Sequence, residues 1–410
     1  MKKLLACFLA LVLLLPAIAL GEEVKTLELM WFSDGAETAA MQKLIDQYEA
    51  EHPTIKIELL EVPFEDMSKK IMMAASGGEA PALVRTTEGI ISNCNEAFVD
   101  IADYVEDSDA LLKQFISSIQ SYFVQNGKIC ALPTDVTANG LIYNKTAFDK
   151  AGVSVPSSPD DIWTWEEFIA DLRIVMEKGD VAYGMVIDNP SHRWSTILYE
   201  YGGRLVSPEG PAFNSPEALA AIAMTKSLFD EGIVPKSTWL GGEDPNNLFR
   251  SGQVAVHLAG NWMLTNYRDN IKDFEWGVTY MPIEKNRSSV PGGKQLAACA
   301  NTGVEKEAVD FILWATGQEA NQQYCEESLF ISPRLDNAQL NYSFGSEFFA
   351  IFADELANTV DAAAFDWGFP GLAAKIGTEL TYGMYDVMAG TRTAEDLVEA
   401  VDALSAELFE

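Results

Sequence analysis

Four of the nine tryptophans stand beside short hydrogen-bonding side chains, at places where an α/β chain would leave a strand or enter a loop. These groups are Trp31 with Ser33 and Asp34, Trp194 after His192 and Arg193, Asn261 with Trp262, and Asp366 with Trp367. A sugar ring presents an apolar C–H face and a rim of hydroxyls, so its site needs flat aromatic surface and short donors and acceptors. The four groups therefore favour a carbohydrate site, with a core position as the alternative for each tryptophan. Trp163, Trp165, Trp276 and Trp314 fall within expected helices or strands, and we assign them to the core.

Motifs for catalysis and nucleotide binding are absent from the sequence. It contains no G-x-x-x-x-G-K-[ST], G-x-G-x-x-G, G-x-S-x-G or H-E-x-x-H. No local pattern places His52, His192 or His257 in a Ser-His-Asp relay. Paired carboxylates are uninformative among 61 acidic residues, because some pair always looks suitable for glycoside hydrolysis. We expect no catalytic residue, no metal and no cofactor.

The charge excludes two classes of partner. With 28 Lys and Arg against 61 Asp and Glu, the net charge is −33, which repels nucleic-acid phosphates and anionic lipid headgroups. Apolar residues make up 48% and charged residues 22% of the chain, as in folded proteins. A length of 410 residues predicts two domains or one large α/β domain.

The amino-terminal residues have the layout of a cleavable signal peptide. Lys2 and Lys3 precede an apolar run, residues 4–15, followed by Pro16 and the small-residue pattern at 17–19. A run of about 12 residues is too short to span a bilayer, and no later segment reaches 18 uncharged apolar residues. Cleavage is expected after Ala19 or Gly21. The sequence thus predicts a periplasmic or extracytoplasmic protein without stable membrane insertion.

Four cysteines would remain after cleavage: Cys94, Cys130, Cys299 and Cys325. Export permits disulfides, and four cysteines allow three pairings. The alternative is four buried thiols that act as small apolar residues.

The periodicity of apolar residues predicts an α/β fold. Residues 26–32 form an apolar strand, Met41, Leu44, Ile45 and Tyr48 form one helical face ended by His52-Pro53, and residues 55–59 alternate as a second strand. This is a βαβ unit, which implies a parallel sheet. A capping box at Thr164–Glu167 opens a helix through Met176, and further helices are expected at 216–229, at 305–314 and after Thr393.

A series of short motifs extends over the mature chain. They are 131–136 (ALPTDV), 140–145 (GLIYNK), 148–153 (FDKAGV), 164–168 (TWEEF), 249–256 (FRSGQVAV), 259–262 (AGNW), 291–293 (PGG), the helix at 306–316, 332–334 (SPR) and 390–393 (GTRT). In this order they resemble the extracellular solute-binding proteins, family 1, of carbohydrate-type ABC importers, which includes maltodextrin-binding proteins. Each motif alone is weak, whereas their order and spacing are specific.

The resemblance implies an α/β periplasmic-binding-protein fold with two discontinuous lobes and a hinge of about three crossings. The expected parts are a signal peptide at 1–21, a first lobe at 22–136 and 283–333, and a second lobe at 137–282 and 334–410. The crossings would lie near 135–138, 281–283 and 332–334, with the ligand held between the lobes.

The resemblance also assigns candidate site residues. Trp262 matches the family's sugar-stacking tryptophan, Trp194 matches an aromatic of the second lobe, and Trp367 lies near a cleft-facing loop. First-lobe polar contacts are expected from Trp31, Ser33, Asp34, Arg85, Thr86, Glu88, Asp135 and Thr137, with Arg193, Asn261 and Asp366 in the second lobe. Many relatives carry P-D before two apolar residues, where this chain reads Pro81-Ala82-Leu83-Val84-Arg85.

Arg85 keeps a second ligand class open. A guanidinium at the cleft could pair with a carboxylate or phosphate, with help from Arg193, and the alternative for both is a salt bridge within an acidic protein. The sequence is therefore interpreted as a monomeric carrier that delivers a carbohydrate to an ABC permease. The alternatives are the same fold with an acidic sugar, polyol or sugar phosphate, and an exported carbohydrate-active enzyme.

Overall fold

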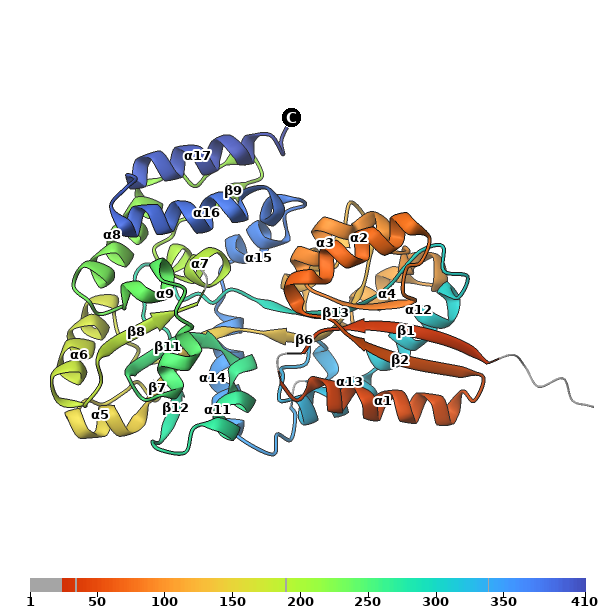
Figure 1. The fold of residues 1–410 in the computed structure, drawn as a ribbon, viewed down its shortest axis with the longest axis horizontal. Helices are drawn as coiled ribbons and strands as arrows, with labels where there is room; N and C mark the ends of the chain where they lie inside the picture. Colours follow the sequence, from red (N-terminus) through yellow and green to blue (C-terminus); the bar gives the residue numbers. More distant parts are fainter. Residues whose placement is uncertain (1–23, 34, 189, 338) are drawn as a thin grey trace, which may run out of the picture.

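Two β-sheets organise the protein, one in each of two lobes (Figure 1). The computed structural model describes residues 24–410 except 34, 189 and 338. The predicted signal peptide and the candidate residue Asp34 lie outside the described residues. Within the described part of the chain, no helix is both long and apolar enough to cross a bilayer.

The first lobe contains a five-stranded sheet in the order β2-β1-β3-β13-β6. Its strands are β1 (Lys25–Trp31), β2 (Ile55–Glu61), β3 (Leu83–Thr86), β6 (Leu132–Thr137) and β13 (Gly292–Ala298). β1 is parallel to β2 and β3, which confirms the predicted βαβ unit. β13 is antiparallel to β3 and β6, because the chain enters it from the second lobe rather than through a crossover helix.

Helices cover both faces of this sheet (Figure 1). They are α1 (Glu37–Glu51), α2 (Met67–Gly77), α3 (Glu88–Cys94), α4 (Ser108–Leu112), α12 (Glu305–Ala315) and α13 (Gln318–Ser328). The short helix η4 (Ser117–Tyr122) and the hairpin of β4 (Val124–Gln125) and β5 (Lys128–Ile129) precede β6. His52 ends α1, as its sequence predicts.

The second lobe contains a four-stranded sheet in the order β12-β7-β11-β8. Its strands are β7 (Asn139–Asn144), β8 (Tyr183–Ile187), β11 (Val254–Gly260) and β12 (Trp276–Thr279). A small hairpin joins β9 (Val206–Ser207) and β10 (Gly210–Pro211). The strand β11 is buried along its whole length, so it forms the centre of this lobe.

The helices of the second lobe come from two separate parts of the chain. The first part supplies α5 (Lys145–Ala151), α6 (Trp165–Lys178), α7 (Pro190–Glu200), α8 (Pro216–Asp230), α9 (Lys236–Leu240), α10 (Pro245–Arg250), η5 (Asn261–Met263) and α11 (Leu264–Asn270). The second part supplies α14 (Ser346–Ala357), α15 (Asp361–Gly368), α16 (Leu372–Ala389) and α17 (Ala394–Ala406). The capping box at Thr164 opens α6 and Thr393 caps α17, which confirms both predicted helix starts.

The chain passes between the two sheets at Ala138, where β6 leads directly into β7. On the return, the segment before β13 remains hydrogen-bonded to the second lobe. The Ile283 N–H donates to Trp163 O at 2.8 Å, and the Ser289 hydroxyl accepts from Asn139 N at 2.8 Å. The lobe boundaries and the number of hinge crossings stay predictions.

Cys94, Cys130, Cys299 and Cys325 are free and buried. Cys94 lies on α3 and Cys325 on α13, and Cys130 and Cys299 directly follow β5 and β13 of the first lobe. Burial raises the pKa of each thiol, to about 12 at Cys299. The alternative of four buried thiols therefore describes this structure. Of the tryptophans assigned to the core, Trp163 and Trp165 are buried, and Trp276 and Trp314 are partly buried.

A buried carboxyl group holds the start of the return segment. Glu355 of α14 is fully buried, and its Oε1 accepts from the Met281 N–H at 3.0 Å and lies 3.4 Å from Arg287 Nη2. Burial raises the pKa of Glu355 to about 7, although the Arg287 charge opposes this shift. The folded protein therefore binds a proton here that the unfolded chain releases near its ordinary pKa of 4.5.

We expect Glu355→Gln to flatten the pH dependence of stability. In the wild type, the contribution of this proton is complete below the unfolded pKa and is lost as pH rises through about 7. The amide cannot ionise, so the difference in unfolding free energy between variant and wild type should grow toward alkaline pH, by on the order of 3 kcal/mol. Thermal denaturation at pH values from below 4.5 to above 7 measures this difference in unfolding free energy. Glu347→Gln, exposed on the same helix, is the matched control, and parallel profiles for wild type and Glu355→Gln would refute the assignment.

Candidate functional site

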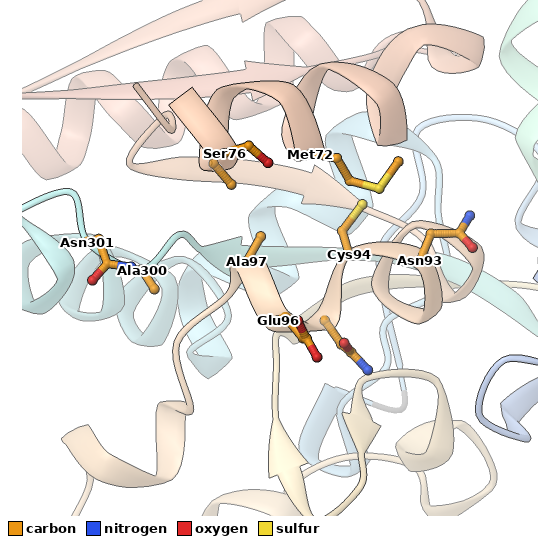
Figure 2. A pocket seen from close by; sticks show the side chains of 10 residues that line it. Met72, Ser76, Asn93, Cys94, Glu96, Ala97, Ala300 and Asn301 are labelled. Atoms are coloured by element: carbon orange, nitrogen blue, oxygen red, sulfur yellow. The ribbon is translucent and has the colours of Figure 1, made fainter. Parts of the chain in front are cut away.

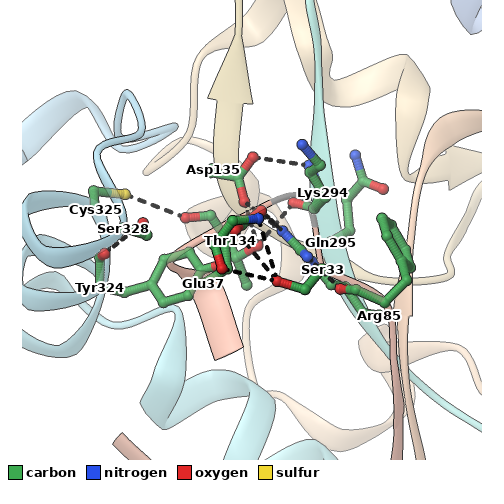
Figure 3. A network of polar contacts seen from close by, with 12 residues as sticks. Ser33, Glu37, Arg85, Thr134, Asp135, Lys294, Gln295, Tyr324, Cys325 and Ser328 are labelled. Carbon is green, nitrogen blue, oxygen red and sulfur yellow. Dashed lines mark hydrogen bonds and ion pairs between the residues drawn. The ribbon is translucent and has the colours of Figure 1, made fainter. Parts of the chain in front are cut away.

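Arg85, predicted to face a ligand, is instead buried inside the first lobe (Figure 3). Its Nη2 lies 3.2 Å from Glu37 Oε1 and 4.0 Å from Asp135 Oδ2, and its Nη1 donates to the Phe32 carbonyl. The guanidinium also stacks on Trp31, with 4.4 Å from Cζ to the ring centroid. A buried charge needs such partners, so the salt-bridge alternative holds for Arg85 and the ligand-pairing prediction is corrected.

Other first-lobe candidates belong to the same interior. Trp31 is buried and donates from Nε1 to Thr38 Oγ1 at 3.1 Å, and Thr86 donates from Oγ1 to Gln295 O at 3.2 Å. Asp135 accepts from the Lys294 N–H at 3.2 Å. Burial raises the pKa of Asp135, while the charges of Lys294 and Arg85 oppose that shift. In this structure Trp31, Thr86 and Asp135 support the lobe and do not present a surface to a ligand.

Ser33 is exposed on the loop after β1, where its hydroxyl donates to Gly35 O at 3.2 Å. It is the described part of the Ser33-Asp34 pair and can reach solvent.

Two second-lobe candidates are also core residues. Trp194 is fully buried on α7, donates from Nε1 to Thr225 Oγ1 on α8 at 2.8 Å, and meets Phe213 edge-on. Asp366 is fully buried and accepts from Tyr199 Oη at 3.1 Å and from the Leu205 N–H at 2.5 Å. Burial raises the pKa of Asp366 to about 6. Both predictions of a cleft position are therefore corrected.

The remaining second-lobe candidates form a cluster on the side facing the first lobe. The Arg193 guanidinium lies over the Trp262 ring, 4.1 Å from Cζ to the centroid, and its Nη1 is 2.6 Å from His192 Nδ1. The His192 ring lies 4.9 Å from that of Trp367, whose Nε1 donates to Ser195 Oγ at 2.9 Å. Burial and the Arg193 charge lower the pKa of His192 well below its ordinary value, so this imidazole is neutral. Three ring systems and one cation are thus brought together.

The crossing between the lobes supplies polar groups next to this cluster. Asn261 is buried and accepts at Oδ1 from the Ala138 N–H at 3.0 Å. Its Nδ2 has no hydrogen-bond partner among the described residues, although buried donors are nearly always paired. Thr137 pairs with Gly292 across β6 and β13. A Cβ on Gly292 would lie 2.8 Å from Thr137 Oγ1 and 3.8 Å from His192 Cε1, so the two lobes approach closely here.

Charged side chains of both lobes lie close together beside the cluster around Trp262. Glu88, at the start of α3, is partly buried, and burial raises its pKa. The charges of Arg193, from the second lobe, and Lys294, from the first, oppose that shift. Sequence reasoning named His192 beside Trp194 without assigning it to the site, and it missed Lys294 and Ser195. Lys294 directly follows the Pro291-Gly292-Gly293 motif, and this adjacency is the signal that could have identified it.

A cavity elsewhere in the first lobe lacks the features expected of a sugar site. It has a volume of about 560 Å³ between α2, α3 and the end of β13, and Figure 2 shows Met72, Ser76, Cys94 and Asn301 around it. Among the described residues that line it there is no aromatic side chain. The cluster around Trp262 is therefore the better candidate.

Comparisons with known proteins identify the family and the fold. The family model described as bacterial extracellular solute-binding protein matches residues 33–322. A binding protein of Brucella abortus (strain 2308) is 26% identical over 243 residues, 57% of this chain and 57% of its own length. The chain thus spans little more than half the length of that relative.

Other relatives match over longer regions. The arabinooligosaccharide-binding protein of Bacillus subtilis (strain 168) is 22% identical over 345 residues, 78% of this chain and 77% of its own. The sn-glycerol-3-phosphate-binding periplasmic protein of Escherichia coli O1:K1 / APEC is 25% identical over 310 residues, 71% and 68% respectively.

Among solved structures, the GacH receptor of Streptomyces glaucescens, determined unliganded and with acarbose, superposes with a TM-score of 0.79 at 21% identity. The match covers 93% of this chain and 98% of the receptor. At this identity the likeness shows the two-lobed fold.

Proposed function

Because this chain belongs to the bacterial extracellular solute-binding protein family, we propose that it captures a carbohydrate between its lobes as the substrate-binding component of an ABC importer. The family consists of binding proteins rather than enzymes. We propose that this chain likewise binds without catalysis, as an exported monomer that leaves its signal peptide behind and presents the bound sugar to permease subunits.

One observation carries this proposal. Trp262 is partly exposed where the lobes meet, and its neighbour Asn261 has a buried donor without a partner among the described residues. An indole face and an unused amide donor match the apolar face and the hydroxyl rim of a sugar ring. Trp367 and Ser195 are buried beside this surface and hydrogen-bonded to each other, so they support it and do not touch the ligand.

Contacts from both lobes explain how capture would be signalled. A ligand held by Trp262 on one side and by Thr137 and Glu88 on the other interacts better with the closed protein than with an open one. It therefore shifts the population toward the closed form by its difference in affinity for the two forms. The permease would recognise that form.

A sugar phosphate or acidic sugar is the second candidate. Arg193 and Lys294 are both near Glu88 and could bind an anion, and one relative is named as a binder of sn-glycerol 3-phosphate. Arg85 gives this candidate no support, because Glu37 and Asp135 already neutralise it.

A ligand panel distinguishes these candidates. We expect a neutral oligosaccharide such as maltotriose or arabinotriose to raise the unfolding temperature of the mature protein, and the rise to be independent of salt. A ligand at about 100 times its Kd adds about 2.7 kcal/mol to stability. Stabilisation by sn-glycerol 3-phosphate that shrinks at high salt would favour the anionic candidate. Appearance of cleaved sugar would identify an enzyme and overturn the proposal.

A further inference from the structure

Helix α15 is fixed to the second lobe by two of its side chains. Asp366 accepts from Tyr199 of α7 and from the backbone of Leu205, and Trp367 donates to Ser195 of α7. These buried contacts tie α15 to α7 and to the backbone at Leu205 in the second lobe. Asp366 and Trp367, which the sequence predicts to touch the ligand, therefore anchor helix α15 instead.

The end of α15 meets the first lobe at η4. Gly368 lies so close to Ser121 that a Cβ on the glycine would be 2.0 Å from Ser121 Oγ and 2.4 Å from Ser121 Cβ. The Ser121 hydroxyl lies 3.4 Å from the Ala364 carbonyl, to which it donates. Next to it, the Gly371 N–H donates to Ser92 Oγ of α3 at 3.0 Å. Figure 1 shows α15 beside α3, above the strand β6 that joins the lobes.

The other edge of the interface has a weaker form of the same contact. Gly35, before α1, faces Thr265 of α11, and a Cβ there would be 2.8 Å from Thr265 Oγ1 but 3.7 Å from its Cβ. A hydroxyl can rotate away, so this edge tolerates a methyl group. At Gly368 the nearest atoms include Ser121 Cβ, which no rotation moves.

We propose that Gly368 and Ser121 form a closure latch, a contact that permits the lobes to close only because residue 368 has no side chain. Gly368 is not among the glycines with a left-handed backbone, so alanine is acceptable to its own conformation. The three atoms nearest to the added Cβ all belong to Ser121. The latch rests on the proposed function in one respect, that closure is what retains the ligand.

Substitution at the latch should open the protein without altering Trp262 or Asn261. Gly368→Ala forces α15 and η4 apart, which disfavours the arrangement of the lobes seen in this structure before any ligand is present. We expect a changed distance between spin labels on cysteines placed at Lys43 and Glu275, which are exposed in the first and second lobes. We also expect affinity for maltotriose, or for sn-glycerol 3-phosphate if that is the probe that binds, to fall by about tenfold or more.

Two further variants make the test specific. Ser121→Gly in the Gly368→Ala background removes both clashing atoms and should restore the distance and the affinity. Gly377→Ala, on α16 where no atom lies within 4 Å of the added Cβ, should change neither. A merely structural defect at residue 368 would not be rescued by shortening Ser121. If Gly368→Ala does not fold, Ser121→Val enlarges the side chain on the first-lobe side of the same contact and should change the label distance in the same way.

The outcomes separate the latch from the proposed function. The label distance needs no ligand, so it decides the latch even if no sugar binds. A wild-type distance in Gly368→Ala, or failure of Ser121→Gly to restore it, would overturn the latch. Wild-type sugar binding in the same variant would leave the proposed function standing.

Discussion

Arg85→Met is expected to lower the free energy of unfolding by about 3–5 kcal/mol, the range for breaking a buried ion pair from one side. Methionine fills much of the same volume but leaves the Glu37 carboxylate fully buried without its cation. Asp135 also loses the Arg85 charge, 4.0 Å away, and Trp31 loses the guanidinium stacked on its ring. Urea denaturation of the ligand-free protein measures the loss.

A comparison with an exposed pair isolates the effect of burial. Arg173 pairs with Glu231 at 2.6 Å with both side chains about half exposed, so Arg173→Met should change stability by less than about 1 kcal/mol. Adding Glu37→Gln to Arg85→Met should recover part of the loss, because it removes the stranded charge. A stable Arg85→Met protein that had lost an anionic ligand would instead restore Arg85 to the binding site.

Arg85 illustrates why part of the site escaped prediction. Arg85 lies within the short strand β3, in a fold whose ligands lie near strand ends. Its partner Glu37 is 48 residues away, on the first turn of α1. Nothing local in the sequence brings them together, so only the packing of α1 on β3 decides that the guanidinium is neutralised inside the lobe.

Local patterns, in contrast, were sufficient for the elements that the sequence did predict. The apolar face of α1, the alternation in β2 and the capping box at Thr164 are each defined within one or two turns or a single strand. The antiparallel entry of β13 was not predictable this way, because it depends on a return from the other lobe. Family resemblance supplied that long-range organisation as two discontinuous lobes.

Trp194 and Trp262 show, within the candidate site, the same contrast between what local sequence determines and what it does not. Trp194 lies on α7 with Ile197 and Leu198 at helical spacing, an apolar face that the sequence reveals, and it is core. Trp262 follows strand β11 on the short helix η5, where no periodic apolar face includes its ring. Position relative to the helix face separates the buried tryptophan from the partly exposed one better than neighbouring polar residues do.

Trp262→Ala is expected to weaken binding of the best carbohydrate by roughly 10- to 100-fold, because burial and stacking of an indole contribute about 1–3 kcal/mol. The loss should appear in Kd measured by titration calorimetry, with little change in unfolding temperature, since the ring is partly exposed. Trp262→Phe retains a smaller aromatic face and should lie between alanine and wild type.

Two variants test whether carbohydrate affinity depends on the position of the Trp262 ring rather than on the number of tryptophans. Gly260→Ala keeps Trp262 but places a Cβ 1.8 Å from its Cζ3, so the ring must move and affinity should also fall. Trp314→Ala removes a partly buried indole on α12, in the first lobe and packed against Tyr48, and should leave Kd unchanged. Equal affinities for wild type and Trp262→Ala would remove Trp262 from the binding surface. If Gly260→Ala also bound normally, the ligand would have to bind away from the cluster around Trp262, because Trp367 and Ser195 are buried and paired with each other.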